Sequence, residues 1–158
     1  MITDQRIKLL QATPFFGAVS DESITLILEL SETFDVEIGD YFFKQGDYGD
    51  SLFLLEYGSA VVFKTAGERE YPLRRVKDGD CFGELALIDF SPRSASVRAE
   101  SESRAIKIFS SALHKLYQHN AEQFLIIQMN MAREVSRRLR EADNRWFINQ
   151  ANNHFHVD

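Results

Sequence analysis

Residues 49–63, with the sequence GDSLFLLEYGSAVVF, place two short apolar runs on either side of the turn Tyr57-Gly58-Ser59. The same pattern extends from about residue 35 to residue 109, where further apolar runs alternate with Gly-Asp pairs at 39–40, 46–47 and 79–80. Each pair suits a tight turn, because glycine adopts positive φ angles without strain and Asp caps the local backbone. Many short strands with glycine turns between them indicate an antiparallel sandwich or barrel.

Helical spacing flanks this strand region on both sides. Residues 3–34 contain two apolar helical segments, which Pro14 and Gly17 separate, and Ser20 is the expected cap of the second one. Residues 110–150 are again predicted to be helical, and residues 151–158 form a polar tail. We therefore expect a single domain over residues 1–158, with an N-terminal helical segment (1–34), a strand region (35–109), C-terminal helices (110–150) and the tail.

One face of the last predicted helix is apolar. Val135, Leu139, Ala142 and Trp146 follow one another at spacings of four, three and four residues, which places them in one stripe. Such a stripe packs either on the strand region or on a second copy of the chain. The sequence leaves both arrangements open, so a homodimer through this helix is one of two predictions.

Composition argues against several classes of protein. Thirteen Phe and 44% apolar residues are enough for a compact core, and the net charge of -6 argues against a partner that is a nucleic acid. No signal-peptide pattern is seen, and no apolar run reaches the roughly 18 residues of a membrane helix, so we expect a cytoplasmic protein without a membrane partner. Cys81 is the single cysteine and is expected to be buried, while His154 and His156 are interpreted as plain tail residues, so no metal site is expected.

The stretch Phe82-Gly83-Glu84-Leu85-Ala86-Leu87-Ile88 is followed closely by Ser91-Pro92-Arg93-Ser94-Ala95-Ser96-Val97. Gly83 lets the backbone approach another group, and residues 84–87 have the length of one helical turn, whose free N–H groups favour an anion. Arg93, at the predicted start of a strand, carries a planar fork that fits two phosphate oxygens, and Glu84 can accept a hydrogen bond from a sugar hydroxyl. An exposed turn with a surface ion pair is the alternative interpretation.

These two segments closely resemble the phosphate-binding cassette of cyclic-nucleotide-binding domains. That family includes the bacterial catabolite activator protein, the regulatory subunits of cAMP-dependent kinase and cyclic-nucleotide-gated channels. The resemblance also covers the spacing of the glycines upstream of these segments, and it extends from about residue 10 to about residue 145. It implies a mainly β fold, an antiparallel β-roll (a double-stranded β-helix of jelly-roll type) over residues 35–109, with N-terminal helices, C-terminal lid helices and a cassette at residues 82–97.

The resemblance also implies a role for each cassette residue. Glu84 would accept a hydrogen bond from the ribose 2′-hydroxyl, and Arg93 would neutralise the cyclic phosphate. Gly83 would permit close approach of the sugar. The backbone N–H groups of Leu85 and Ala86, together with the hydroxyl or the amide of Ser94, would complete the phosphate cradle.

The nucleotide base would lie in a second part of the same pocket. The residues that match this part of the family pocket are Val62, Leu73, Arg74 and Phe82. The C-terminal helix would cover the base through Leu139, Ala142 and Asp143, with Asp143 either accepting from an exocyclic amine or simply facing solvent. In the family, Ala at the position of Ser94 goes with cAMP and Thr often supports cGMP, whereas the bacterial activator has Ser and prefers cAMP. We therefore expect cAMP as the ligand, with cGMP as the alternative.

The leading hypothesis is a non-catalytic cyclic-nucleotide sensor that signals to an unidentified protein effector through its C-terminal helix. We expect no enzymatic activity and no cofactor, because the sequence offers no nucleophile–base pair, no metal site and no paired carboxylates of a cyclase. A transcription regulator is the first alternative, but its helix-turn-helix module needs roughly 60 residues after the long helix. Only twelve residues follow Trp146, so this alternative requires that the gene continue past Asp158. An interaction module that no longer uses its pocket is the second alternative, and the intact Glu84 and Arg93 argue against it.

Overall fold

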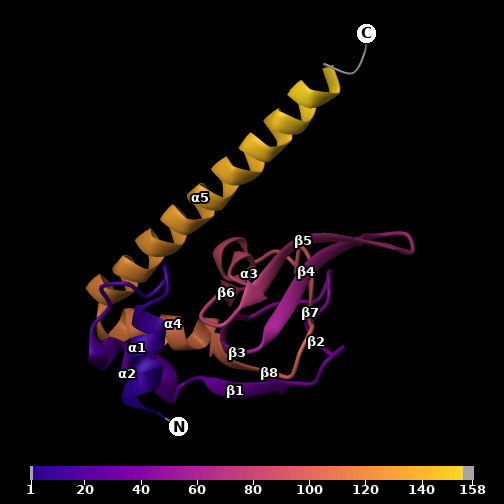
Figure 1. Cartoon of the computed structure of the whole chain (residues 1–158). Coiled ribbons are helices and arrows are strands. Elements are labelled where there is room, and N and C mark those ends of the chain that lie inside the picture. Colours follow the sequence, from indigo (N-terminus) through magenta and orange to yellow (C-terminus); the bar gives the residue numbers. More distant parts are fainter. Residues whose placement is uncertain (1, 155–158) are drawn as a thin grey trace.

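Short helices gather at one end of the molecule. The computed structural model describes residues 2–154, and α1 (Asp4–Gln11), α2 (Asp21–Glu29) and α4 (Ser110–His119) lie together beside the strands (Figure 1). Ser20 caps α2 as expected, because its side chain accepts a hydrogen bond from the Ser23 backbone N–H. Helix α5 (Ala121–His154) starts among these helices and projects beyond the strands.

Two antiparallel four-stranded sheets make up the body of the described chain. The first contains, in spatial order, β1 (Glu32–Val36), β8 (Ser103–Phe109), β3 (Ser51–Tyr57) and β6 (Cys81–Phe82). The second contains β2 (Tyr41–Phe43), β7 (Ser96–Ala99), β4 (Ser59–Ala66) and β5 (Arg69–Lys77). The short helix α3 (Leu85–Asp89) follows β6. The predicted antiparallel β-roll with flanking helices is confirmed.

Strand β3 is buried on both of its faces over residues 51–55. Phe53 packs with residues of the second sheet and stacks on Phe82 with ring centroids 5.4 Å apart. Leu52 and Leu54 point the other way and pack with residues of the helices. Full burial of each large apolar side chain stabilises the fold by roughly 1.5–3 kcal/mol. The uninterrupted apolar run of β3 is explained by the sheet on one side and the helices on the other.

Two boundaries differ from the expected ones. Residues 32–34 belong to β1 and pair with β8, so the N-terminal helical segment ends earlier than predicted. Helix α5 passes the predicted end at residue 150 and continues to His154, because no Gly or Pro interrupts residues 121–154. His156 and the rest of residues 155–158 lie outside the described residues.

The apolar stripe of α5 is only partly buried. Val135 is half-buried, whereas Leu139 is 60% exposed and Trp146 is 66% exposed. Ala142 is exposed as well. The stripe as a whole therefore does not pack on the roll, because α5 leaves the roll before its last turns.

Cys81 is buried in β6, as expected, and burial raises the pKa of its thiol to about 12. Over residues 2–154, no helix is both long enough and apolar enough to cross a bilayer. Among the side chains that the structure describes, no three of His, Cys, Asp or Glu are arranged to hold a metal ion.

Candidate functional site

A cavity of about 680 Å³ lies between the roll, α3 and α5. Of the residues predicted for the site, all but Asp143 line this cavity. They are Val62, Leu73, Arg74, Phe82, Gly83, Glu84, Leu85, Ala86, Arg93, Ser94, Leu139 and Ala142. The structure thus brings together residues from β4, β5, β6, α3 and α5, although their roles toward a ligand stay predictions.

Arg93 lies at the floor of the cavity and is only 6% exposed. Its guanidinium donates one hydrogen bond from Nη1 to the Gly83 carbonyl and another from Nη2 to the Ser51 carbonyl, each at 2.7 Å. The Phe43 ring lies beneath it, with the guanidinium carbon 4.0 Å from the ring centroid. These contacts fix the guanidinium against the wall of the cavity.

The charge of Arg93 has no carboxylate counterpart. Within the described part of the chain, its guanidinium forms no ion pair and bonds only to neutral oxygens, while its buried Nε has no hydrogen-bond partner. Burial lowers the pKa of this guanidinium, and the negative charges of Asp50, Asp47 and Glu84 oppose that shift. Buried charges in proteins are normally paired, so an anionic group in the cavity would complete the contacts of this guanidinium.

Two glycines make room for this guanidinium. A Cβ atom on Gly49 would lie 2.6 Å from Arg93 Cζ and 3.0 Å from the Ala86 Cβ. A Cβ atom on Gly83 would lie 2.8 Å from Arg93 Nη1 and 3.1 Å from the Phe43 ring, and Gly83 also has a positive φ of 81°. Both positions therefore require glycine while Arg93 occupies its present place.

Arg93 does not begin a strand, contrary to the sequence prediction. Strand β7 starts at Ser96, three residues later, and Arg93 lies in the preceding loop. Its backbone N–H donates to the Asp47 carbonyl and its carbonyl accepts from the Gly46 N–H, both at 2.8 Å. The loop is therefore held by the turn at residues 46–47 rather than by a regular sheet ladder.

Glu84 lies just before α3 and is 3% exposed. Its Oε1 accepts a hydrogen bond from Nη1 of Arg138, which comes from α5. Among the described residues, no donor bonds to its other oxygen, Oε2. The N–H groups of Leu85 and Ala86 open α3 and have no carbonyl within the helix to bond. In the part of the chain that the structure describes, one Glu84 carboxylate oxygen and the two amides thus have no protein partner.

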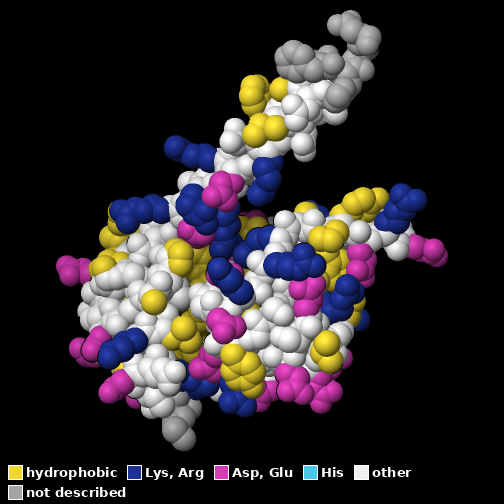
Figure 2. All heavy atoms as spheres, in the orientation of Figure 1, with side chains coloured by type: hydrophobic (Ala, Val, Ile, Leu, Met, Phe, Trp, Pro, Cys, Tyr) yellow, Lys and Arg dark blue, Asp and Glu magenta, His cyan; other side chains and the backbone are white. Residues whose placement is uncertain are grey.

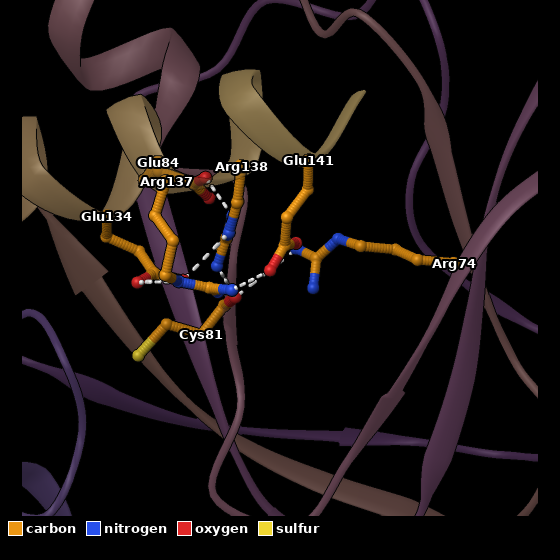
Figure 3. Close-up of polar contacts among 7 residues, drawn as sticks. All are labelled: Arg74, Cys81, Glu84, Glu134, Arg137, Arg138 and Glu141. Atoms are coloured by element: carbon orange, nitrogen blue, oxygen red, sulfur yellow. Dashed lines mark hydrogen bonds and ion pairs between the residues drawn. The ribbon is translucent and has the colours of Figure 1, made fainter. Parts of the chain in front are cut away.

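Helix α5 contributes an ion network that sequence reasoning missed. Figure 3 shows Arg138 between carboxylates, with its Nε donating to Glu134 at 3.1 Å and its Nη2 donating to the Cys81 carbonyl at 3.4 Å. Glu134 also accepts two hydrogen bonds from Arg137, which in turn donates to Glu141. The only sequence signal was a Glu four positions before an Arg, a spacing that is common on solvated helix faces.

The wall on the β5 side combines apolar and basic side chains. Val62 is 9% exposed and Leu73 is 52% exposed. Arg74 donates to the Cys81 carbonyl at 3.4 Å and forms no ion pair with any described residue. Burial lowers the pKa of Arg74, and the positive charge of Arg138 lowers it further. Figure 2 shows basic side chains gathered where α5 meets the roll, so this side of the cavity also favours acceptor groups.

The lid residues are only partly in place. Leu139 and Ala142 line the cavity, but Asp143 does not. Asp143 is exposed on a different face of α5, because one residue further along a helix turns the side chain by about 100°. In this structure, Asp143 is therefore not positioned to contact a ligand in the cavity.

Comparison with known proteins identifies relatives of this chain. The sequence model of one family, described as cyclic nucleotide-binding domain, matches residues 34–120. A cAMP-dependent protein kinase regulatory subunit from Emericella nidulans is 36% identical over 107 residues, which are 68% of this chain and 26% of that protein. A cyclic AMP receptor protein from Thermus thermophilus is 30% identical over 135 residues, which are 85% of this chain and 61% of that protein.

A solved structure gives the same relationship at the level of the fold. The catabolite activator protein of Thermus thermophilus matches with a TM-score of 0.76 and 29% identity, over 87% of this chain and 63% of that one. The chain spans about a quarter of the kinase regulatory subunit and about three fifths of the receptor protein.

Proposed function

The chain belongs to the family of cyclic nucleotide-binding domains, and from this premise we propose that it is a non-catalytic sensor whose ligand is cAMP. Both curated relatives described above are named for cAMP, which supports cAMP over cGMP. In this proposal a protein effector responds to the bound state through α5, which lines the cavity and projects beyond the roll.

The unpaired charge of Arg93 is the observation that carries the proposal. A buried guanidinium that bonds only to neutral oxygens gains most from a ligand that brings a single negative charge. The cyclic phosphate of a nucleotide supplies that charge, and its ester oxygens attach it directly to a ribose. A ligand held by its phosphate at Arg93 would therefore present its sugar to the same cavity.

Glu84 is suited to the sugar of that ligand. Its carboxylate lines the cavity and keeps one oxygen free of protein donors among the described residues. A ribose 2′-hydroxyl would donate to this oxygen, and hydrogen bonds to charged groups contribute about 1.5–3 kcal/mol. A free phosphate lacks this hydroxyl, so Glu84 favours a nucleotide over a simple anion.

Titration calorimetry of the whole chain with cAMP, cGMP and 2′-deoxy-cAMP tests the proposal. We expect micromolar binding of cAMP, weaker binding of cGMP, and about tenfold weaker binding of 2′-deoxy-cAMP because one hydrogen bond to a carboxylate is lost. Glu84→Gln should weaken cAMP binding by about tenfold and should reduce the preference for cAMP over its 2′-deoxy form, because a neutral amide binds the hydroxyl more weakly than a carboxylate does.

Glu102→Gln is the matched control, because Glu102 is an exposed carboxylate whose side chain takes no part in the cavity. It should bind all three ligands as the wild type does. Tighter binding of cGMP than of cAMP would overturn the choice of nucleotide. If none of the three nucleotides binds, the sensor proposal is wrong and the interaction module becomes the better interpretation.

We further propose that α5 forms a homodimer. Eight positions along this helix alternate at spacings of four and three residues, and all eight are exposed: Leu125, Met129, Ala132, Ser136, Leu139, Asp143, Trp146 and Gln150. Four of these positions are apolar and lie seven residues apart, namely Leu125, Ala132, Leu139 and Trp146. Such a seven-residue repeat is typical of the seam of a two-stranded coiled coil. The three polar members, Ser136, Asp143 and Gln150, would weaken the seam and fix its register.

Trp146→Glu should weaken this dimer by about tenfold or more, because buried Trp residues contribute strongly to interfaces. Ile148→Glu is the control, since Ile148 is 48% exposed on the same helix but is not one of the eight seam positions. Sedimentation equilibrium measures both variants. A monomeric wild type, or equal effects of the two substitutions, would contradict a dimer through this seam.

A further inference from the structure

The hydrogen bonds of Arg138 are divided among three acceptors. Its Nε donates to Glu134 at 3.1 Å, its Nη2 donates to the Cys81 carbonyl at 3.4 Å, and its Nη1 donates to Glu84 (Figure 3). A guanidinium is planar and rigid, so three acceptors on different edges fix its orientation.

Glu134 is the most strongly bound of these acceptors. Its side chain is 8% exposed, and its two oxygens accept hydrogen bonds from Arg137 at 2.6 and 3.0 Å in addition to the one from Arg138. The hydrogen bonds from Arg137 lower the pKa of Glu134, so its carboxylate stays ionised at neutral pH. Glu134 therefore fixes the Nε edge of Arg138.

Because its other donors are occupied, Arg138 makes a single hydrogen bond to Glu84. Arg138 contacts only Oε1 of Glu84 and leaves Oε2 without a protein donor among the described residues. An arginine whose Nε edge is free tends to bind a carboxylate through two parallel hydrogen bonds, which would occupy both oxygens. Arg138 would then donate to the oxygen that the ribose hydroxyl needs and compete with that hydroxyl for it.

We propose that Glu134 is a positioning residue for nucleotide binding, which holds Arg138 in a single contact with Glu84 and so keeps the second Glu84 oxygen free for the ribose. This inference rests on the proposed function. It deepens that function because it assigns ribose recognition to a residue of α5 that does not touch the ligand.

Calorimetry with cAMP and 2′-deoxy-cAMP tests the role of Glu134 in the whole chain. Glu134→Gln removes the charge at nearly constant volume, and we expect it to weaken cAMP binding by about five- to thirtyfold while changing the affinity for 2′-deoxy-cAMP by less than about twofold. In an Arg138→Gln background the same substitution should have no further effect, because the group that it orients is absent.

Glu122→Gln is the matched control, because Glu122 is an exposed carboxylate of the same helix that does not line the cavity. It should leave both affinities within about twofold of the wild type. The inference is overturned if Glu134→Gln binds cAMP like the wild type, if both nucleotides lose affinity equally, or if the loss persists with Arg138→Gln. A merely destabilised variant would produce the second of these results. Failure of the proposed function looks different, since the wild type itself would then not bind cAMP.

Discussion

We expect Arg93→Ala to lower the affinity for cAMP by about 30- to 1,000-fold, which corresponds to roughly 2–4 kcal/mol of binding free energy. The effect is large because Arg93 is the buried cation of the cavity and has no carboxylate partner among the described residues. A phosphate that enters the variant leaves water without gaining a charged hydrogen bond in return. The neighbouring Glu84 carboxylate would then repel it.

Calorimetry checks this result, and thermal unfolding checks that the variant is folded. We expect a modest change in Tm, because the substitution removes a desolvated charge but leaves the carbonyls of Gly83 and Ser51 without their donor. Arg75→Ala is the control, since Arg75 is 74% exposed in its side chain and pairs with Glu100 on the surface. Unchanged cAMP affinity in Arg93→Ala would place the ligand somewhere else on the molecule.

The sequence predicted the fold well where local chemistry determines the structure. The glycine turns and apolar runs of residues 35–109 predicted an antiparallel arrangement, and the strands lie where those runs occur. The start of β7 was misplaced at Arg93, because nothing in the sequence says that the loop there bonds to the turn at residues 46–47. Pairing between distant loops depends on tertiary structure rather than on local propensity.

The candidate site was predicted less completely than the fold. The cavity-lining positions of Glu84 and Arg93 followed from one short segment and its resemblance to a family, whereas Glu134 and Arg138 lie about 50 positions further along the chain. On a helix, a Glu and an Arg four residues apart look the same whether they face solvent or a cavity. Only the direction in which α5 crosses the roll distinguishes the two, and that direction also turns Asp143 away from the cavity.

Gly49 illustrates a second kind of residue that the sequence does not reveal. In the sequence, Tyr48-Gly49-Asp50 has the composition of one more glycine turn, like the turn at Gly46, which has a positive φ of 88° and open space where a Cβ atom would lie. Gly49 does not have a positive φ, so its backbone would accept an alanine without strain. It is required for a different reason, because a side chain there would occupy the place of the Arg93 guanidinium.

Gly49→Ala should therefore weaken cAMP binding by about 30- to 300-fold while the protein stays folded. The new Cβ atom would lie 2.6 Å from Arg93 Cζ, and a flexible side chain gives way more easily than the backbone, so Arg93 has to leave its hydrogen bonds to Gly83 and Ser51. Gly67→Ala is the matched control, since Gly67 has a positive φ of 63° and open space where a Cβ atom would lie, so strain there should cost roughly 1 kcal/mol of stability without displacing Arg93. Calorimetry and thermal unfolding of the two variants should thus give opposite patterns, with binding lost in the first and Tm lowered in the second. Wild-type affinity in Gly49→Ala would mean that the phosphate does not depend on the present position of the Arg93 guanidinium.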